Sequence, residues 1–174
     1  LIDENTPLNP KTYYSISKMR GESFMERLGE KIPTHIIRIG NLYGFNQSMR
    51  FDAVINRFAF DANFHKKITI HGNGMQERAF INVDKAAKII SNLLVDESKK
   101  SSLCNLVDFN KSVMDIAMTF KEIYPELEMQ FINQHLKLRN LAIGTNCSMF
   151  DEIRTGEVDI KQELQHIIMQ FAFH

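Results

Sequence analysis

The sequence has few of the residues that build disulfide-rich domains or metal sites. It contains only two cysteines, Cys104 and Cys147, and their spacing matches neither a metal motif nor a disulfide framework. We therefore expect two small buried thiols in a protein of a reducing compartment. The six histidines are scattered along the chain and form no ligand pair. The sequence accordingly predicts no metal site.

Excess charge and long apolar runs are also missing. The 21 Lys and Arg residues balance the 21 Asp and Glu residues, so bulk charge indicates neither a nucleic-acid partner nor a membrane-surface partner. No apolar run approaches the roughly 20 residues that cross a bilayer. With 44% hydrophobic and 24% charged residues, a chain of this length can bury a core. These features predict a soluble, cytoplasmic protein.

Hydrophobic periodicity predicts helices and strands in alternation. We expect helices over residues 11–29, 52–65 and 159–172, one that opens at Asp84 and one capped by Ser112. We expect strands over residues 34–39 (a buried strand), 67–70, 79–82, 103–107 and 129–132. In the helix that Asp84 opens, the spacing predicts a buried stripe of Ala87, Ile90, Leu93 and Leu94. Such an order is typical of an α/β fold.

Tyr14 and Lys18 form the pair of residues with the most specific chemistry. Residues four apart on a helix lie on one face, which Tyr13 does not share with Lys18. An ammonium close to a phenol stabilises its charged form and allows proton exchange nearer neutral pH. An isolated Tyr-x-x-x-Lys is more often a surface pair, so the interpretation depends on the residues around it.

Three motifs follow one another in the chain. Tyr14, Ser17, Lys18 and Glu22 fit P…Y-x-x-S-K-x-x-x-E, residues 33–44 fit P-x-x-x-x-R-x-x-N-x-Y-G, and residues 72–83 fit G-x-G-x-Q-x-R-x-F-x-x-V. In this order they resemble the extended short-chain dehydrogenase/reductase family, which includes the nucleotide-sugar epimerases and dehydratases. The resemblance covers about residues 1–95.

The resemblance implies a fold and a domain division. It implies an α/β chain that is the C-terminal part of a Rossmann-type parallel sheet interwoven with a smaller α/β substrate-binding domain. Residues 1–45 would carry the Rossmann remnant with the Tyr-Lys helix, and residues 46–174 mainly the substrate-binding domain. The family's glycine-rich dinucleotide turn is not found before Tyr14. We therefore expect a C-terminal fragment of a longer enzyme that by itself is inactive and binds NAD(P) weakly or not at all.

Site residues follow from the resemblance on the cofactor side. Tyr14 would exchange a proton with the sugar hydroxyl, and Lys18 would assist it and hydrogen-bond the ribose of the nicotinamide. Both residues are thus predicted to be catalytic and cofactor-binding. Ile39 and Leu42 would line the nicotinamide side of the cofactor pocket. Arg38 lies in the same motif, where a structural salt bridge is the expected role.

On the substrate side, the resemblance implies that Asn41 and Arg78 meet the diphosphate, since a guanidinium matches phosphate oxygens bidentately. Thr69 and His71 would lie where the family holds the nucleobase, largely through backbone groups. Arg139 would be a second phosphate-binding arginine, with an ordinary surface role as an equal alternative.

The function implied for the whole enzyme is that of an NAD- or NADP-dependent epimerase, dehydratase or reductase acting on a nucleoside-diphosphate sugar. The alternative is a non-catalytic nucleotide-sugar-binding or assembly module. The residues present do not identify the sugar, the base or the choice between NAD and NADP. In the family the Tyr-Lys helix commonly lies in a two-fold interface, and Phe24, Met25 and Leu28 add apolar surface here. We therefore expect a homodimer or a larger assembly.

Overall fold

The computed structural model describes residues 1–95, 101–136, 138–144 and 158–171. The helices in this part are α1 (Tyr13–Leu28), α2 (Val54–His65), α3 (Val83–Val95), α4 (Val113–Ile123) and α5 (Ile160–Gln170). The strands are β1 (His35–Ile39), β2 (Asn41–Tyr43), β3 (Lys67–His71), β4 (Glu77–Asn82), β5 (Ser102–Leu106), β6 (Phe109–Ser112) and β7 (Glu128–Ile132). The predicted α/β class is confirmed, and the short strands β2 and β6 are additions to the prediction.

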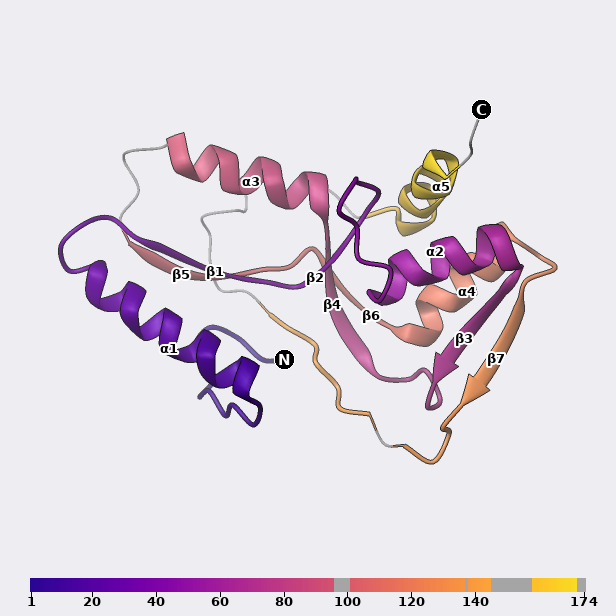
Figure 1. Ribbon diagram of the computed structural model, residues 1–174, viewed down its shortest axis with the longest axis horizontal. Coiled ribbons are helices and arrows are strands. Elements are labelled where there is room, and N and C mark those ends of the chain that lie inside the picture. Colours follow the sequence, from indigo (N-terminus) through magenta and orange to yellow (C-terminus); the bar gives the residue numbers. More distant parts are fainter. Residues whose placement is uncertain (96–100, 137, 145–157, 172–174) are drawn as a thin grey trace.

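The strands form three small sheets. β1 pairs with β5 in parallel, and β3 pairs with β7 in parallel. Between them, β4 pairs with β2 in parallel and with β6 antiparallel. Figure 1 shows β1, β5 and α1 at one end of the elongated molecule, and β3, β7, α2 and α4 at the other.

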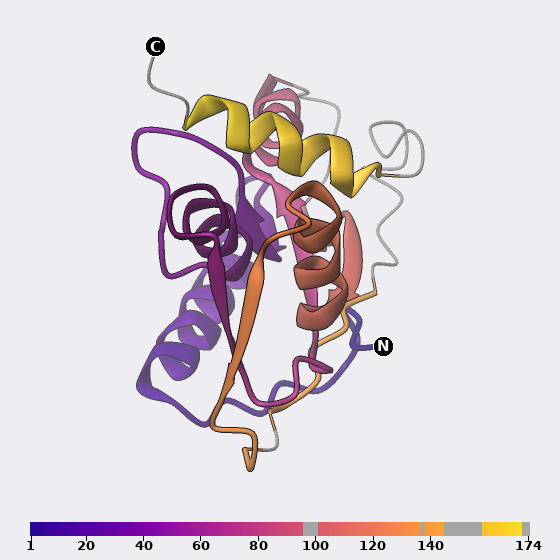
Figure 2. The same cartoon turned by 90° about the vertical axis from the view of Figure 1, so that its right-hand side faces the viewer.

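Strand β4 separates two hydrophobic cores because successive side chains of a strand point to opposite faces. Phe80 belongs to the larger core, together with buried residues of α2, α4 and α5, whereas its neighbour Ile81 belongs to a smaller core with Ile89 and Leu106. Figure 2 shows α5 lying across α2 and α4. The helix predicted over residues 159–172 is therefore confirmed, and its buried residues are Ile160, Leu164 and Ile167.

Helix α1 is attached differently, since none of its residues is buried. It packs on β1, where Glu22 binds Arg38 with both carboxylate oxygens, at 2.9 Å from Nε and 2.6 Å from Nη2. The structural salt bridge expected for Arg38 is thus present. None of the helices in the described ranges is long and apolar enough to span a membrane.

Three details of the sequence prediction are wrong. In α3 the buried residues are Ala86, Ile89 and Leu93, while Ala87 and Leu94 are exposed, because apolar residues surround much of this helix and only packing selects the buried arc. β1 is half-buried rather than buried, since among the described strands it pairs only with β5.

The third wrong detail concerns cysteine. Cys104 is buried in β5 as expected, but it is disulfide-bonded instead of being a free thiol. Separation along the chain does not report distance in the folded protein. Cys147 lies outside the described residues.

Candidate active site

The Tyr-Lys pair lies at the start of α1, whose first turn is fixed by a capping box. The Thr12 hydroxyl accepts from the Ser15 backbone N–H at 3.1 Å, and the Ser15 hydroxyl accepts from the Thr12 N–H at 3.0 Å. One turn along, Lys18 Nζ lies 5.5 Å from the centre of the Tyr14 ring. Tyr14 is 72% exposed, so its side chain is accessible to a substrate while the Lys18 ammonium lies over its ring.

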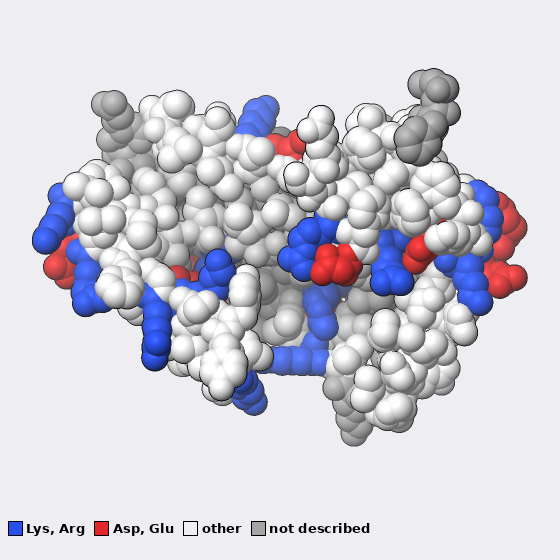
Figure 3. Space-filling view, viewed as in Figure 1, with Lys and Arg blue, Asp and Glu red and all other residues white. Residues whose placement is uncertain are grey.

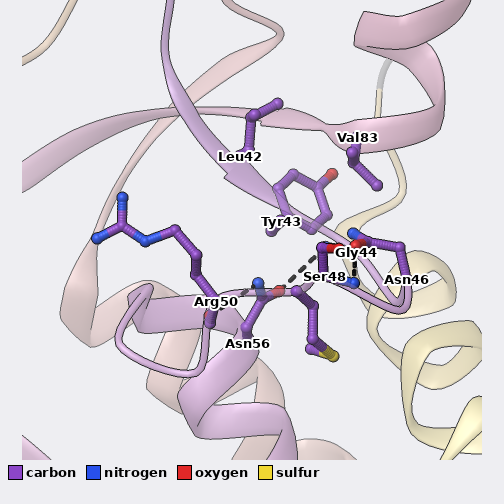
Figure 4. Close-up of a pocket in the computed structure, with 9 residues that line it drawn as sticks. Leu42, Tyr43, Gly44, Asn46, Ser48, Arg50, Asn56 and Val83 are labelled. Carbon is purple, nitrogen blue, oxygen red and sulfur yellow. Dashed lines mark hydrogen bonds between the residues drawn. The ribbon is translucent and has the colours of Figure 1, made fainter.

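A cavity of about 200 Å³ lies at the carboxyl ends of β2 and β4, the end of a parallel sheet at which ligands usually bind. Its lining residues, shown in Figure 4, are Leu42, Tyr43, Gly44, Asn46, Ser48, Met49, Arg50, Asn56 and Val83. Gly44 has a φ of 127°, and a Cβ there would come within 2.8 Å of Val83 Cγ1. Only glycine fits this turn.

Asn56 holds the loop that walls this cavity. Its Oδ1 accepts from the Gly44 N–H at 3.0 Å, and its Nδ2 donates to the Arg50 carbonyl at 3.2 Å. One buried amide thus joins both ends of the loop. Sequence reasoning missed Asn56, since a polar residue on an otherwise apolar helix face was its only signal.

Arg50 lines the cavity and forms an ion pair with Asp52. The Asp52 carboxylate, which accepts from Arg50 at 3.0 and 2.5 Å, raises the pKa of Arg50 above its ordinary value. Tyr14 adds a smaller electrostatic contribution in the same direction.

Arg78 and Asn41 lie on one face of the central sheet. Asn41 is paired with Phe80 in the parallel register, and Arg78 precedes Phe80 by two positions, so all three side chains share a face. The Asn41 amide donates to the Ala79 carbonyl at 2.9 Å. Arg78 Nη1 donates to the Glu77 and Arg139 carbonyls at 2.7 and 2.6 Å.

The charge of Arg78 is not balanced by a carboxylate, because none in the described part of the chain forms an ion pair with it. Partial burial lowers the pKa of Arg78. The guanidinium is therefore a partly buried cation, and its hydrogen-bond partners among the described residues are carbonyl oxygens. Such a group is suited to bind an anion.

The remaining predicted residues lie on β3, at the end of β1 and on β2. Thr69 and His71 are on the outer face of β3, and the His71 carbonyl accepts from Gln76 Nε2 at 3.2 Å. Ile39 and Leu42 each expose 41% of their surface. Among the predicted site residues only Leu42 lines the cavity, so the individual roles stay predictions.

Comparison with known proteins now identifies the family. Residues 2–106 match the sequence profile of the NAD dependent epimerase/dehydratase family. The chain belongs to this family. NAD is part of the family's own description, and the resemblance inferred from the three motifs is confirmed.

Two curated relatives illustrate the similarity. The chain is 30% identical over 136 residues to dTDP-D-glucose 4,6-dehydratase of Homo sapiens, which covers 74% of this chain and 38% of the relative. It is 29% identical over 160 residues to a putative UDP-glucose 4-epimerase of Methanocaldococcus jannaschii, which covers 90% of this chain and 46% of the relative. The chain thus spans less than half the length of these relatives.

Solved structures show the same fold. UDP-glucuronic acid 4-epimerase from Bacillus cereus, in complex with UDP-glucuronic acid and NAD, matches with a TM-score of 0.79 at 20% identity, over 97% of this chain and 56% of that one. dTDP-glucose 4,6-dehydratase from Bacillus anthracis, in complex with NAD, matches with a TM-score of 0.78 at 19% identity, over 97% and 54%. The predicted Rossmann-type architecture is confirmed.

In this epimerase/dehydratase chain, α5 contacts a residue that lines the cavity, Tyr43. The buried Tyr43 hydroxyl donates to Glu163 of α5, and Asn82 Nδ2 donates to the same carboxylate oxygen at 3.1 Å. Burial, reinforced by the Glu163 carboxylate, raises the pKa of Tyr43 well above its usual range. Tyr43 therefore remains a protonated hydrogen-bond donor. The Phe45 and Phe171 rings, whose centres are 5.4 Å apart, add a second link between the loop and α5.

Replacing Glu163 with Ala is expected to lower the free energy of unfolding by about 1–3 kcal/mol, because the buried Tyr43 hydroxyl would lose its acceptor. Glu163→Gln keeps an acceptor oxygen and is expected to cost less. Urea unfolding of both variants measures the difference. An Ala variant as stable as the unmodified protein would show that this contact contributes nothing.

Proposed function

We propose that this chain supplies the proton-transfer pair and the nucleotide-sugar-binding part of an NAD(P)-dependent enzyme that acts on a nucleoside-diphosphate sugar as an epimerase, dehydratase or reductase. The observation that carries the proposal is the accessible Tyr14 side chain, with Lys18 Nζ at 5.5 Å from the centre of its ring. The family to which the chain belongs supports the same chemistry.

Tyr14 would take or return the proton of a sugar hydroxyl, and the Lys18 ammonium would stabilise the phenolate in between. The nicotinamide cofactor, when bound, accepts or returns the hydride of the same carbon. Lys18 would hold the ribose of this cofactor, and the exposed apolar side chains of Ile39 and Leu42 would lie against its nicotinamide. The apolar side chains of Ile39 and Leu42 are suited to a flat nicotinamide ring, and the Lys18 ammonium is suited to the ribose hydroxyls.

Arg78 and Asn41 would bind the diphosphate from their shared face of the sheet, with Thr69 and His71 on the side of the nucleobase. Arg139, whose carbonyl holds the Arg78 guanidinium, would be a second phosphate ligand. Lys and Arg bind phosphate more strongly where no carboxylate competes for them.

Replacing Arg78 with Met should weaken UDP or dTDP binding by about tenfold or more, the scale of a lost hydrogen bond to a charged group. Isothermal titration of the protein with each nucleotide measures the effect. Arg57→Met on the exposed side of α2 is a matched control that should bind normally. Equal binding by the Arg78 variant, or no binding by the unmodified protein, would contradict the assignment.

The alternative is a non-catalytic binding or assembly module. The observation that favours it is the exposed apolar face of α1, on which Phe24, Met25 and Leu28 expose 66%, 40% and 39% of their surface. Homodimer formation through this face, a cytoplasmic location and the inactivity of this chain by itself stay predictions. An assay of the full-length protein with NAD and UDP- or dTDP-sugars would discriminate between the two functions.

A further inference from the structure

Arg78 has a second cation directly beside it. In the antiparallel register of β4 and β6, Arg78 is the partner of Lys111. Directly opposite residues of an antiparallel pair point to the same face, and their Cβ atoms are about 4.5–5.5 Å apart. Like charges in such positions repel one another and destabilise the pair. This arrangement is therefore unfavourable by itself, and an anion between the two side chains would stabilise it.

No carboxylate in the described ranges compensates the two charges. None of the ion pairs between described residues involves Arg78 or Lys111. The neighbouring acid Glu77 points to the other face of β4, because adjacent strand residues alternate. Asp115 is engaged by Ser112, from whose hydroxyl it accepts at 2.7 Å.

A third basic residue contacts Arg78 through its backbone. The Arg139 carbonyl accepts from Arg78 at 2.6 Å. Figure 3 shows a hollow at the lower centre of the molecule, between the part formed by α1 and the part formed by β3 and β7, and Lys and Arg side chains line it.

A diphosphate needs more than one cation. A guanidinium matches the oxygens of one phosphate bidentately, whereas a lysine ammonium binds phosphate as a point charge. We propose that Lys111 is a further substrate-binding residue, which pairs with Arg78 to hold the diphosphate of the sugar nucleotide. The proposal rests on the proposed function and names a residue that none of the three motifs contains.

The pairing has a consequence that a structural role would not have. Lys111 is expected to contribute to the binding of a nucleoside diphosphate more than to that of a monophosphate, because the second phosphate requires the second charge. Without ligand, removing Lys111 relieves the repulsion on Arg78, so the melting temperature should stay the same or rise.

The test compares Lys111→Met and Lys111→Arg with Lys88→Met, an exposed lysine of α3, by titration with UDP and UMP and by thermal melting. We expect Lys111→Met to weaken UDP binding by about tenfold, with a smaller effect on UMP and no loss of melting temperature. The Arg variant should keep affinity close to that of the unmodified protein, and the Lys88 variant should be unaffected.

Each other result overturns the inference in a recognisable way. If Arg78→Met weakens UDP binding and Lys111→Met does not, Lys111 is not a ligand although the proposed function stands. If the unmodified protein binds neither UDP nor dTDP, the proposed function fails and the inference fails with it. If Lys111→Met and Lys111→Gln both lower the melting temperature, Lys111 stabilises the sheet and the repulsion argument is wrong.

Discussion

Replacing Tyr14 with Phe in the full-length enzyme is expected to reduce turnover of the natural sugar nucleotide by about a hundredfold or more, the usual scale for a positioned proton-transfer group. The change removes only the hydroxyl. Tyr14 is exposed and buries no core surface, so the fold should not be affected. A loss of rate would thus report the lost proton transfer.

Tyr13→Phe is the matched control for this experiment. Tyr13 is the neighbouring residue on α1 and is 94% exposed, but it does not share the helix face of Lys18. Steady-state rates of both variants, measured at saturating cofactor and sugar nucleotide, test the pair. Normal turnover by Tyr14→Phe would mean that this tyrosine is not the acid or base, and that another group moves the proton.

The second large effect is expected in the core. Phe120 of α4 is fully buried, and its ring lies 6.3 Å from the Phe58 ring of α2 at an interplanar angle of 81°. Phe120→Ala is expected to lower the free energy of unfolding by about 3–5 kcal/mol, because it removes buried apolar surface and leaves a cavity between α2, α4 and β3. Urea or thermal unfolding measures the change.

Met118→Ala on the same helix is the control, since Met118 is 46% exposed. Substitutions at the surface usually change stability by about 0.5 kcal/mol or less. Similar losses in the two variants would show that the larger core does not dominate the stability of the chain. A small loss for Phe120→Ala alone would mean that the core closes around the vacated space.

The sequence predicted those elements that depend on contacts between residues close together in the chain. Ser112 predicted the start of α4 because its hydroxyl accepts from the Asp115 N–H at 3.0 Å, a contact made within four residues. Helix spacing likewise placed Tyr14 and Lys18 together, since the distance between positions i and i+4 depends on helix geometry alone. The family followed from three motifs in order.

Other elements depend on partners that are distant in the sequence. β2 has only three residues and β6 only four, too few for a recognisable alternation, and both exist because β4 lies between them. The buried arc of α3 was predicted wrongly for a related reason. Its apolar residues cover more than one arc, and the packing of the smaller core selects Ala86, Ile89 and Leu93.

The sequence by itself determined the fold class, most of the helices, the Tyr-Lys pair and the family, because each of these depends on spacing within a few residues or on short motifs. Only the tertiary structure decided that Glu163 accepts from Tyr43, 120 positions away, and that Lys111 lies opposite Arg78. Strand register and helix docking result from the joint burial of many side chains, so no short stretch of sequence specifies them.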